Sequence, residues 1–524
     1  MNKYKIIIVL ISVLLVFGCD NPWDEHVKIN DDVLQESIGA YLASNSDFSS
    51  FTELLETTGM NEVLSSSVIY TVWAPTNQAM QAVDENLLSS DEKKKLFVQN
   101  HIAFGSFSAK DEHAPARITM RSKKMLDYNL GNATIDDKAI LVDREVEVKN
   151  GTVQVIGSAL SPRYSIWEYL ELEAPKNDFV NFLNSLTTEV FYEDSSLQTG
   201  INENGKPVYD SVWVVENVFL KYFVDLSSED TLATFLIPTD EVFESEFNKF
   251  QKFYRIEDKR NNPAPSSRDS LNIRLMLARD MAIAGRYNSD DAADTLLSFY
   301  HVKVPFVKNA ITGSFKASNG FVHLMSECPV KVSDKIQPIL MEAETHVYST
   351  RMSSGSPAPY FRLRDDASEG MDFICDNSHN SQRLSGVVFA GPMVSSIKYR
   401  VKIRAINDFG KSYRRQDTSI VLIQKVGTVT ISRDQNTNEI TAISEVTNPL
   451  NFANTEFGTA DVTSDTIFVE QQAYSAVDEA RSDEIDLGFY EFNRSDNVFL
   501  RLIPLASQMA VTADYFRLVP IIEE

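Results

Sequence analysis

One eleven-residue unit occurs twice in the chain, and it constrains the fold more than any other feature. The copies are Tyr70-Thr-Val-Trp-Ala-Pro-Thr-Asn-Gln-Ala-Met80 and Ala233-Thr-Phe-Leu-Ile-Pro-Thr-Asp-Glu-Val-Phe243. Each begins with apolar residues typical of a buried strand. Proline ends strand pairing because it lacks an N–H group, and the threonine with its polar neighbour can cap a following helix. Each copy therefore predicts a buried strand that turns directly into a helix.

Three more elements recur around this unit in the same order. An apolar segment with helical spacing precedes it, a segment containing a histidine follows it, and a strand opened by Asn-Gly closes it. In copy one and then copy two, they lie around Phe48 and Phe179, at His101 and His301, and at Asn150-Gly151 and Asn319-Gly320. The second copy also carries an insertion around residues 192–228. The sequence therefore predicts a duplicated module of helices and strands.

The repeated elements resemble the fasciclin (FAS1) domain. The family's core corresponds here to Thr71-Val72-Trp73-Ala74-Pro75-Thr76, and its closing strand to Asn150-Gly151. The resemblance covers roughly residues 30–170 and 175–332. It implies an α+β fold in which each copy pairs a β-wedge with a group of helices. It also implies adhesion or extracellular binding, and seldom catalysis.

Length and charge limit the domain number and the partners. The chain has 524 residues and a formal net charge of -25, which argues against a nucleic acid as partner because that needs a basic face. The length suits about three or four domains. We expect a signal peptide at 1–18, a tether at 19–35, a first FAS1 domain at 36–172, a divergent second one at 173–332 and an all-β sandwich at 333–524.

The amino-terminal segment has the pattern of an export signal. Two lysines precede an apolar run from Ile6 to Phe17, which is too short to cross a bilayer but suits a signal peptide core. Gly18-Cys19 then resembles the cleavage box of bacterial lipoproteins, which implies a lipid such as palmitate on Cys19. The acidic residues that follow resemble a surface-export signal of Bacteroidetes lipoproteins. The resemblance implies an outer-membrane protein at the cell surface, with the periplasmic face as the alternative.

The last third changes from helical spacing to strand alternation. Tyr399, Val401 and Ile403 alternate with cations, so each set is expected on one face of a strand. Many short strands separated by turns favour a β-sandwich. Met341–Glu344 and Asp514–Pro520 faintly resemble carbohydrate-binding jelly rolls, and a sandwich without a sugar site is the alternative. Further strands are expected at 419–424, 428–432, 466–469, 498–503 and 516–521.

Two groups of residues are candidates for ligand binding. The first is a cationic stripe on one strand face, which can hold an acidic sugar or an acidic patch of a partner. The alternative is an exposed face whose cations pair with neighbours or prevent edge pairing. The second group lies in the insertion of copy two, where binding loops tend to be added. The stripe is Lys398, Arg400, Lys402 and Arg404, and the insertion contributes Tyr209 and Trp213.

No catalytic or metal-binding motif is apparent in the sequence. The patterns His-Glu-x-x-His, Cys-x-x-Cys and Gly-x-Ser-x-Gly are absent, and so is a phosphate loop. We therefore expect no catalytic residues, no metal and no cofactor. His101 and His301 are expected to brace the fold. Cys328 and Cys375 are expected to be separate buried thiols, with a disulfide as the alternative.

These observations lead to a hypothesis of a non-enzymatic surface lipoprotein. It would bind an oligo- or polysaccharide, or dock on an outer-membrane uptake complex that resembles the starch-utilisation (SusCD-like) type. The partners would then be the transporter and its lid lipoprotein. The lipid anchor would hold the protein at the membrane. The first alternative is an adhesin or scaffold that contacts other proteins or host matrix. A hydrolase in the last third is a further hypothesis.

Overall fold

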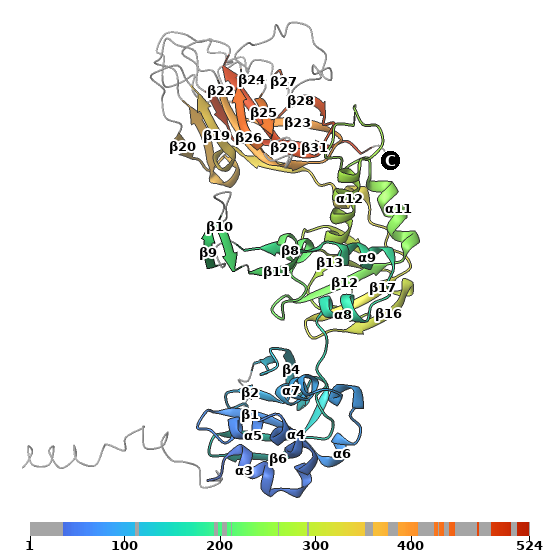
Figure 1. Ribbon diagram of the computed structural model, residues 1–524. Helices are drawn as coiled ribbons and strands as arrows, with labels where there is room; N and C mark the ends of the chain where they lie inside the picture. The colour runs from blue at the N-terminus through green and yellow to red at the C-terminus, as the bar shows by residue number, and fades with distance from the viewer. Residues whose placement is uncertain are drawn as a thin grey trace, which may run out of the picture. The chain divides into compact units, whose positions relative to one another are not determined.

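Figure 1 shows the computed structural model of the chain. It describes residues 35–109, 115–192, 197–201, 207–210, 212–259, 261–290, 293–351, 360–375, 386–406, 424–427, 429–433, 440–445, 469–470, 484–504 and 511–522. Contacts divide the chain into two compact units. The first holds the chain up to Ala174 with Asp225–Ala233 and Phe315–Phe321, and the second holds the remainder. The predicted signal peptide, Cys19 and nearly all of the tether lie outside the described residues.

The first unit combines short helices with a seven-stranded sheet. Its helices are α3 (Ile38–Ser44), α4 (Ser49–Thr57), α5 (Met60–Leu64), α6 (Asn77–Met80), α7 (Asp91–Gln99) and α8 (Ile166–Leu172), with 3-10 turns η1 (Ser46–Phe48) and η2 (Glu85–Leu88). Its strands are β1 (Tyr70–Pro75), β2 (Ile102–Phe104), β3 (Arg117–Thr119), β4 (Met125–Asn129), β5 (Thr134–Ile135), β6 (Lys138–Val148) and β7 (Gly151–Ile156).

The sheet has the order β2-β1-β7-β6-β5-β4-β3, with β1 parallel to β7. Its first and last strands also meet, because Ala103 after the start of β2 forms an antiparallel bridge with Met120 just beyond β3. The amide of Arg121 donates to the carbonyl of Ile102 at 2.7 Å beside that bridge. The free edge of β2 is therefore closed by the segment that follows β3.

Alternate residues of β1 face two separate apolar clusters. Val72 packs with helix residues that include Phe51 of α4 and Phe97 of α7. Trp73 points the other way and packs with Leu126 and neighbouring strand residues. Both faces of β1 are buried, as the continuous apolar run predicts. The strand predicted from the first repeat copy is confirmed.

The turn from strand to helix differs between the two copies of the repeated unit. The Thr76 hydroxyl accepts a hydrogen bond from the amide of Ala79 and caps α6, as predicted. In the second copy, β12 (Ala233–Pro238) is likewise buried and leads into α11 (Asp240–Phe250), but Thr239 makes no such side-chain bond. The carboxylate of Asp240 accepts instead from the amide of Asp178. The predicted helix is confirmed there, and the predicted cap is wrong.

The buried amide of Asn150 ties three segments of the first unit together. Its oxygen accepts from the amide of Ile38 at 2.8 Å, and its nitrogen donates to the carbonyls of Leu64 and Ser66 at 2.7 and 2.8 Å. The next residue, Gly151, has a φ of 141°, and a Cβ there would lie 1.8 Å from the carbonyl oxygen of Tyr70. The Asn-Gly pair therefore anchors the parallel pairing of β1 and β7, because any larger residue would push the two strands apart.

Asn319 of the second copy makes the same three hydrogen bonds as Asn150. Its partners lie at the start of α8 and in the segment that precedes β12. Its oxygen accepts from the amide of Ile166 at 2.9 Å, and its nitrogen donates to the carbonyls of Leu226 and Ser228, each at 2.9 Å. A Cβ at Gly320 would lie 1.7 Å from the carbonyl oxygen of Ala233. The predicted correspondence between Asn150-Gly151 and Asn319-Gly320 is therefore confirmed by the hydrogen bonds of the two asparagines.

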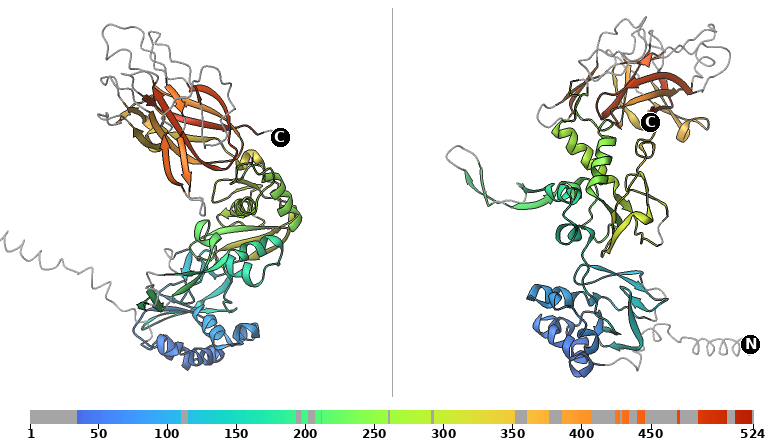
Figure 2. Two further views of the ribbon diagram at one scale, coloured as in Figure 1. Left: turned by 45° about the horizontal axis from the view of Figure 1, so that its top comes forward. Right: turned by 90° about the vertical axis from the view of Figure 1, so that its right-hand side faces the viewer.

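The remaining elements lie mostly in the second unit (Figures 1 and 2). Its first part includes a four-stranded sheet of order β13-β12-β17-β16. Besides β12 and α11, the elements are α9 (Asp178–Ser185), β8 (Thr187–Phe191), β9 (Leu197–Ile201), β10 (Pro207–Asp210), β11 (Trp213–Asn217), α10 (Val218–Tyr222), α12 (Ser267–Asp280), β13 (Ala282–Ala284), β14 (Thr295–Leu297), β15 (Lys303–Pro305), η4 (Lys308–Ala310), β16 (Ile311–Lys316), β17 (Gly320–Met325) and α13 (Val332–Lys335).

The alignment of His101 with His301 is wrong. The carbonyl of His101 accepts from the amide of Trp73, and the corresponding bond of the second copy runs from Leu236 to Met281. His301 lies in a turn after β14 with a φ of 59°, the same left-handed conformation that Lys123 adopts in the first unit. Matching the two histidine-containing segments by residue type was therefore wrong: the equivalent of His101 in the second copy is Met281, and His301 corresponds to Lys123.

The last third forms several antiparallel sheets. Their orders are β18-β31-β23-β28, β19-β22-β29-β24-β27, β20-β21-β30 and β25-β26. The elements are β18 (Ile339–Glu342), α14 (Ala343–His346), β19 (Val347–Arg351), β20 (Tyr360–Leu363), η5 (Ser368–Gly370), β21 (Met371–Cys375), β22 (Gly386–Val394), β23 (Lys398–Arg404), β24 (Gln424–Gly427), β25 (Val429–Arg433), β26 (Ile440–Glu445), β27 (Val469–Glu470), β28 (Glu484–Glu491), β29 (Asp496–Pro504), β30 (Val511–Ala513) and β31 (Tyr515–Pro520).

Ring contacts join the two largest of these sheets. Phe389 of β22 lies 4.9 Å from Phe516 of β31 between ring centres, and both side chains are buried. The predicted alternation along β23 is confirmed, since Tyr399, Val401 and Ile403 are buried. Several expected strands are present at shifted bounds, whereas residues 419–423, 428 and 466–468 lie outside the described residues. The prediction that this region is rich in strands is therefore confirmed for the residues that the structure describes.

Cys328 and Cys375 are free and buried, as expected. Burial raises the pKa of the Cys328 thiol to about 12.

In the part of the chain that the structure describes, no helix is both long enough and apolar enough to cross a membrane.

Replacing Asn150 with alanine should lower the free energy of unfolding of the first unit by about 3 kcal/mol, because buried groups lose their hydrogen-bond partners. Chemical denaturation of the full chain tests this. Asn132→Ala is the matched control, since the Asn132 side chain is exposed. Equal stability of the two variants would contradict the role given to the Asn150 amide.

The imidazole of His101 should make stability depend on pH. Its Nδ1–H donates to the carbonyl of Phe97, the amide of Leu160 donates to its Nε2, and burial lowers its pKa from 6.5 to about 4. As the pH falls below about 6.5, the unfolded chain takes up a proton that the folded chain does not bind. The free energy of unfolding should therefore decrease between pH 6.5 and 4, by up to about 3 kcal/mol.

Denaturation at several pH values measures this contribution as the difference between wild type and His101→Gln. The exposed His301 supplies the control variant His301→Asn, which should keep the wild-type pH profile. A His101→Gln profile that parallels the wild type would show that another group causes the acid sensitivity.

Candidate functional site

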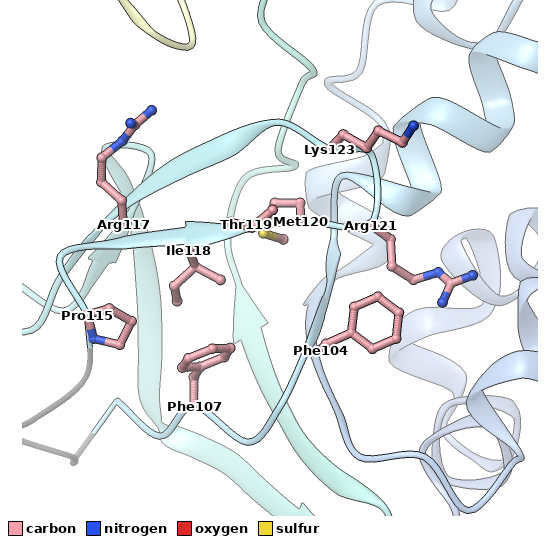
Figure 3. Close-up of a pocket in the computed structure, with 9 residues that line it drawn as sticks. All are labelled: Phe104, Phe107, Pro115, Arg117, Ile118, Thr119, Met120, Arg121 and Lys123. Atoms are coloured by element: carbon pink, nitrogen blue, oxygen red, sulfur yellow. The ribbon is translucent and has the colours of Figure 1, made fainter. Parts of the chain in front are cut away.

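A groove of about 580 Å³ lies beside β2 and β3 in the first unit (Figure 3). Apolar side chains form most of it, and basic side chains stand at its rim. The lining residues are Phe104, Phe107, Pro115, Arg117, Ile118, Thr119, Met120, Arg121 and Lys123. Its volume lies within the usual range for small-molecule pockets of roughly 300–1,000 Å³.

Two short strands and two backbone turns position these residues. β2 ends at Phe104, and Gly105 follows with a φ of 99°, which favours glycine. The amide of Met120 donates to the carbonyl of Lys124 at 2.8 Å and forms a tight turn after β3, with Lys123 in the left-handed region. This turn places Arg121 beside Phe104.

Buried apolar side chains form the floor of the groove. Ile118 and Met120 are nearly inaccessible to solvent. The ring of Phe107 lies 6.3 Å from the Trp73 ring and is stacked on it, which connects the floor to the core behind β1. In Figure 3, Ile118 and Phe107 point toward the same space, whereas the Arg117 side chain points away from them. The floor is therefore rigid and apolar.

Arg121 stands at one end of the groove between two aromatic rings. Its guanidinium carbon lies 5.2 Å from the ring centre of Phe104 and 5.6 Å from that of Tyr70. Its Nη1 donates to the Tyr70 hydroxyl at 3.2 Å, and its buried Nε has no hydrogen-bond partner. Among the described residues, which do not include 110–114, no carboxylate pairs with Arg121.

Two other cations near the groove, Arg117 and Lys124, have carboxylate partners. The Nε of Arg117 lies 3.5 Å from Asp127, and the ammonium group of Lys124 contacts Glu168 at 2.5 Å and Glu229 at 3.1 Å. These ion pairs fix the positions of the Arg117 and Lys124 side chains. Among the described residues, Arg121 and Lys123 have no carboxylate partner, and Arg121 contacts two ring faces and a hydroxyl instead.

The groove has room for a ligand, and the described residues of its lining, which do not include 110–114, offer no group suited to general acid or base catalysis. Its side chains are aromatic, aliphatic, hydroxyl or permanently cationic at neutral pH. No cluster of three His, Cys, Asp or Glu side chains that could hold a metal occurs among the residues the structure describes. The sequence analysis missed this site, because Phe104 and Arg121 are distant in sequence and form no recognisable motif.

The predicted cationic stripe lies on β23, and neighbouring strands supply partners for its cations. Lys402 pairs with Glu484 at 2.7 Å, and Arg400 lies 3.4 Å from Asp486. Arg404 pairs with the buried Asp514. Lys398 lies over the ring of Phe489 at 5.3 Å. This arrangement matches the alternative in which the stripe is neutralised within the fold, and ligand binding there stays a prediction.

The insertion in the second unit forms two-stranded ribbons. β8 pairs antiparallel with β11, and β9 with β10 (Figure 2). Trp213 begins β11 and is 59% exposed, while Tyr209 lies on β10, where the structure describes the backbone. The prediction that Trp213 is a surface feature is confirmed. A binding role for either residue stays a prediction.

Comparison with known proteins identifies the class of domain in the first unit. Residues 46–162 match the family model described as the fasciclin domain. The chain therefore carries a fasciclin (FAS1) domain, and the groove, β1 and Asn150 all lie within it. Protein sll1483 of Synechocystis sp. is 26% identical over 127 residues, which cover 23% of this chain and 70% of that protein.

Two solved structures share low similarity with the chain. One is a FAS1 domain pair from the insect cell adhesion molecule Fasciclin I, with a TM-score of 0.22 and 13% identity over 56% of this chain and 100% of that one. The other is the second N-terminal cellulose-binding domain of β-1,4-glucanase C from Cellulomonas fimi, with a TM-score of 0.17 and 10% identity over 35% of this chain and 96% of that one. Neither score is high enough to support an argument about fold or ligand.

Proposed function

We propose that this protein is a non-enzymatic docking protein held at the outer surface of the outer membrane, and that it contacts an uptake transporter through the ribbon β8–β11. The observation that carries the proposal is a run of exposed apolar residues on that ribbon. Val212, Trp213, Val214 and Val215 are consecutive, and Val215 is 66% exposed. Exposed apolar side chains in such a run usually mark an interaction surface.

Among the residues that the structure describes, the ribbon is held by its own pairing and by the Asn217 side chain at its base, which donates to the carbonyl of Leu183 and the hydroxyl of Thr187. Trp213 lies opposite Phe191 with ring centres 5.5 Å apart, and Val215 lies opposite Glu189 on the same face. A two-stranded hairpin is marginally stable in water without further packing. A protein partner that covers this face would bury Trp213 and Val215 and stabilise the ribbon. Tryptophan is also among the residues enriched in binding hot spots.

We further propose that the chain from α8 (Ile166–Leu172) to residue 332 is a second FAS1 domain, in which α8 takes the place of α3. The Asn319 amide repeats the bonds of Asn150, and the hydroxyls of Thr71 and Thr234 both donate to a glycine carbonyl, that of Gly105 and Gly285 respectively. Such coincidences of hydrogen bonding are expected of a duplicated fold. They support a tandem arrangement with the ribbon as an insertion in its second member.

The location at the membrane rests on the sequence pattern around Cys19. A lipid on Cys19, followed by a short tether, would hold the domains at the membrane and raise their effective concentration near membrane partners. The lid lipoprotein of the same complex is the second expected partner. Glycan binding by the last third stays part of the proposal, with the low-specificity segments Met341–Glu344 and Asp514–Pro520 as its support.

An adhesin or scaffold is the second candidate function. FAS1 domains occur in a cell adhesion molecule, and the exposed ribbon would serve a matrix or cell-surface partner equally well. The two functions differ in the partner that covers Trp213 and Val215.

Replacing Trp213 and Val215 together with serine should reduce copurification of an outer-membrane transporter at least tenfold, because the variant removes the apolar contact. Affinity purification from detergent-solubilised outer membranes measures this. Leu172→Ser is the matched control, since Leu172 is 60% exposed and lies on α8. Equal recovery of the transporter with the wild type, the double variant and Leu172→Ser would contradict the role of the ribbon. Adherence of the protein to matrix without a copurified transporter would favour the adhesin.

Replacing Cys19 with alanine should release the protein from the membrane fraction, because the lipid anchor could not form. Surface labelling of intact cells and fractionation give the readout, and a Cys328→Ala variant controls for loss of a thiol. Unchanged membrane retention of the Cys19→Ala protein would contradict the anchor.

A further inference from the structure

We propose that the groove beside β2 binds a carboxylated sugar, with Arg121 holding the carboxylate and Phe104 supporting the sugar ring. The carboxylated sugar would be a uronic acid within an oligosaccharide. This site uses other residues than the docking ribbon, so it goes beyond the proposed docking function. Four features of the groove lead to this inference.

The first feature is the charge of Arg121. In a chain of net charge -25, this guanidinium has no carboxylate partner among the described residues, and its Nε is buried without a hydrogen bond. Partly buried polar groups without partners cost free energy. The planar guanidinium suits bidentate binding of a carboxylate. A ligand carboxylate would therefore supply the missing charge partner through the terminal Nη groups, since the buried Nε is closed to a ligand.

The second feature is the aromatic ring beside that charge. Phe104 is 58% exposed, and its ring centre lies 5.2 Å from the guanidinium carbon of Arg121. An aromatic face carries partial negative charge and attracts the slightly positive C–H groups of a pyranose ring. A sugar ring lying on Phe104 would place an exocyclic carboxylate within reach of Arg121. The pair thus matches both parts of a uronic acid.

The third feature is the shape of the groove. About 580 Å³ is enough for one or two sugar rings, and the rim carries the exposed Thr119 hydroxyl and the exposed Lys123. These polar groups suit a hydroxylated ligand, whereas an acyl chain would need an enclosed apolar cavity. An extended peptide is also disfavoured, because the bond from Arg121 to Ile102 and the bridge from Ala103 to Met120 close the edge of β2.

The fourth feature is that the fold does not require these side chains. In the second repeat, the amide of Phe299 donates to the carbonyl of Ala282, as the amide of Arg121 does to Ile102. Phe299 thus replaces Arg121, and Ala284 at the end of β13 replaces Phe104. The same backbone arrangement forms without the arginine and the exposed ring. The backbone arrangement therefore does not depend on this pair, which leaves the pair available for a ligand.

Titration calorimetry of the full chain with tri-uronates of galacturonate, glucuronate and mannuronate tests the proposal, with the corresponding neutral trisaccharides as paired probes. At least one uronate should bind, and its neutral counterpart should bind at least tenfold more weakly. Arg121→Gln should weaken uronate binding at least tenfold, and Arg121→Lys should weaken it less. Phe104→Ala changes an exposed side chain and gives an independent test if an Arg121 variant fails to fold.

Arg274→Gln is the matched control. Arg274 also lies over two rings, at 5.0 Å from Phe243 and 4.9 Å from Phe247, but it has Glu244 as a partner at 3.5 Å. Its variant should bind the uronate as the wild type does. No binding of any uronate, binding unaffected by both Arg121→Gln and Phe104→Ala, or equal binding of an acidic peptide would overturn the proposal. Uronate binding does not depend on the partner of the β8–β11 ribbon. A failure of the docking proposal would therefore leave the uronate proposal standing, and the reverse also holds.

Discussion

The buried amide of Asn150 is the interaction on which the first unit depends. It joins the start of α3, the chain that enters β1 and the start of β7 in a region from which water is excluded. Each group it satisfies would otherwise be a buried polar atom without a partner. Gly151 then allows β7 to approach β1 closely enough for parallel pairing. The core on both faces of β1 can form because this junction fixes the position of the strand.

The same junction recurs at Asn319, while the surfaces around it differ. Phe104 and Arg121 line a groove in the first unit, and Ala284 and Phe299 take their places in the second repeat. The second repeat instead carries the ribbon with exposed Trp213 and Val215. A duplicated framework thus offers different surfaces, which agrees with the general observation that function lies in sites placed on a fold and not in the fold itself.

Errors in the sequence analysis have identifiable physical causes. His301 was matched to His101 by residue type, but the position that accepts the strand's hydrogen bond in the second repeat is Met281, because a backbone bond does not depend on the side chain. For the cations of β23, the sequence analysis offered pairing with neighbours as an alternative to a ligand but could not name the partners Glu484 and Asp486, which lie on β28 about 80 residues further along the chain. Pairing of charges across strands is set by register, which local sequence does not reveal.

By itself, the sequence determined the buried strand β1, its turn into α6, the Asn-Gly junctions and the strand alternation of β23. These features depend on local properties: apolar periodicity, the missing N–H group of proline and the small size of glycine. The tertiary structure decided that Phe104 and Arg121 stand together, that Arg117 and Lys124 have acidic partners, and that four apolar residues of the ribbon face solvent. Those outcomes depend on which distant segments become neighbours, and that is fixed when the whole chain packs.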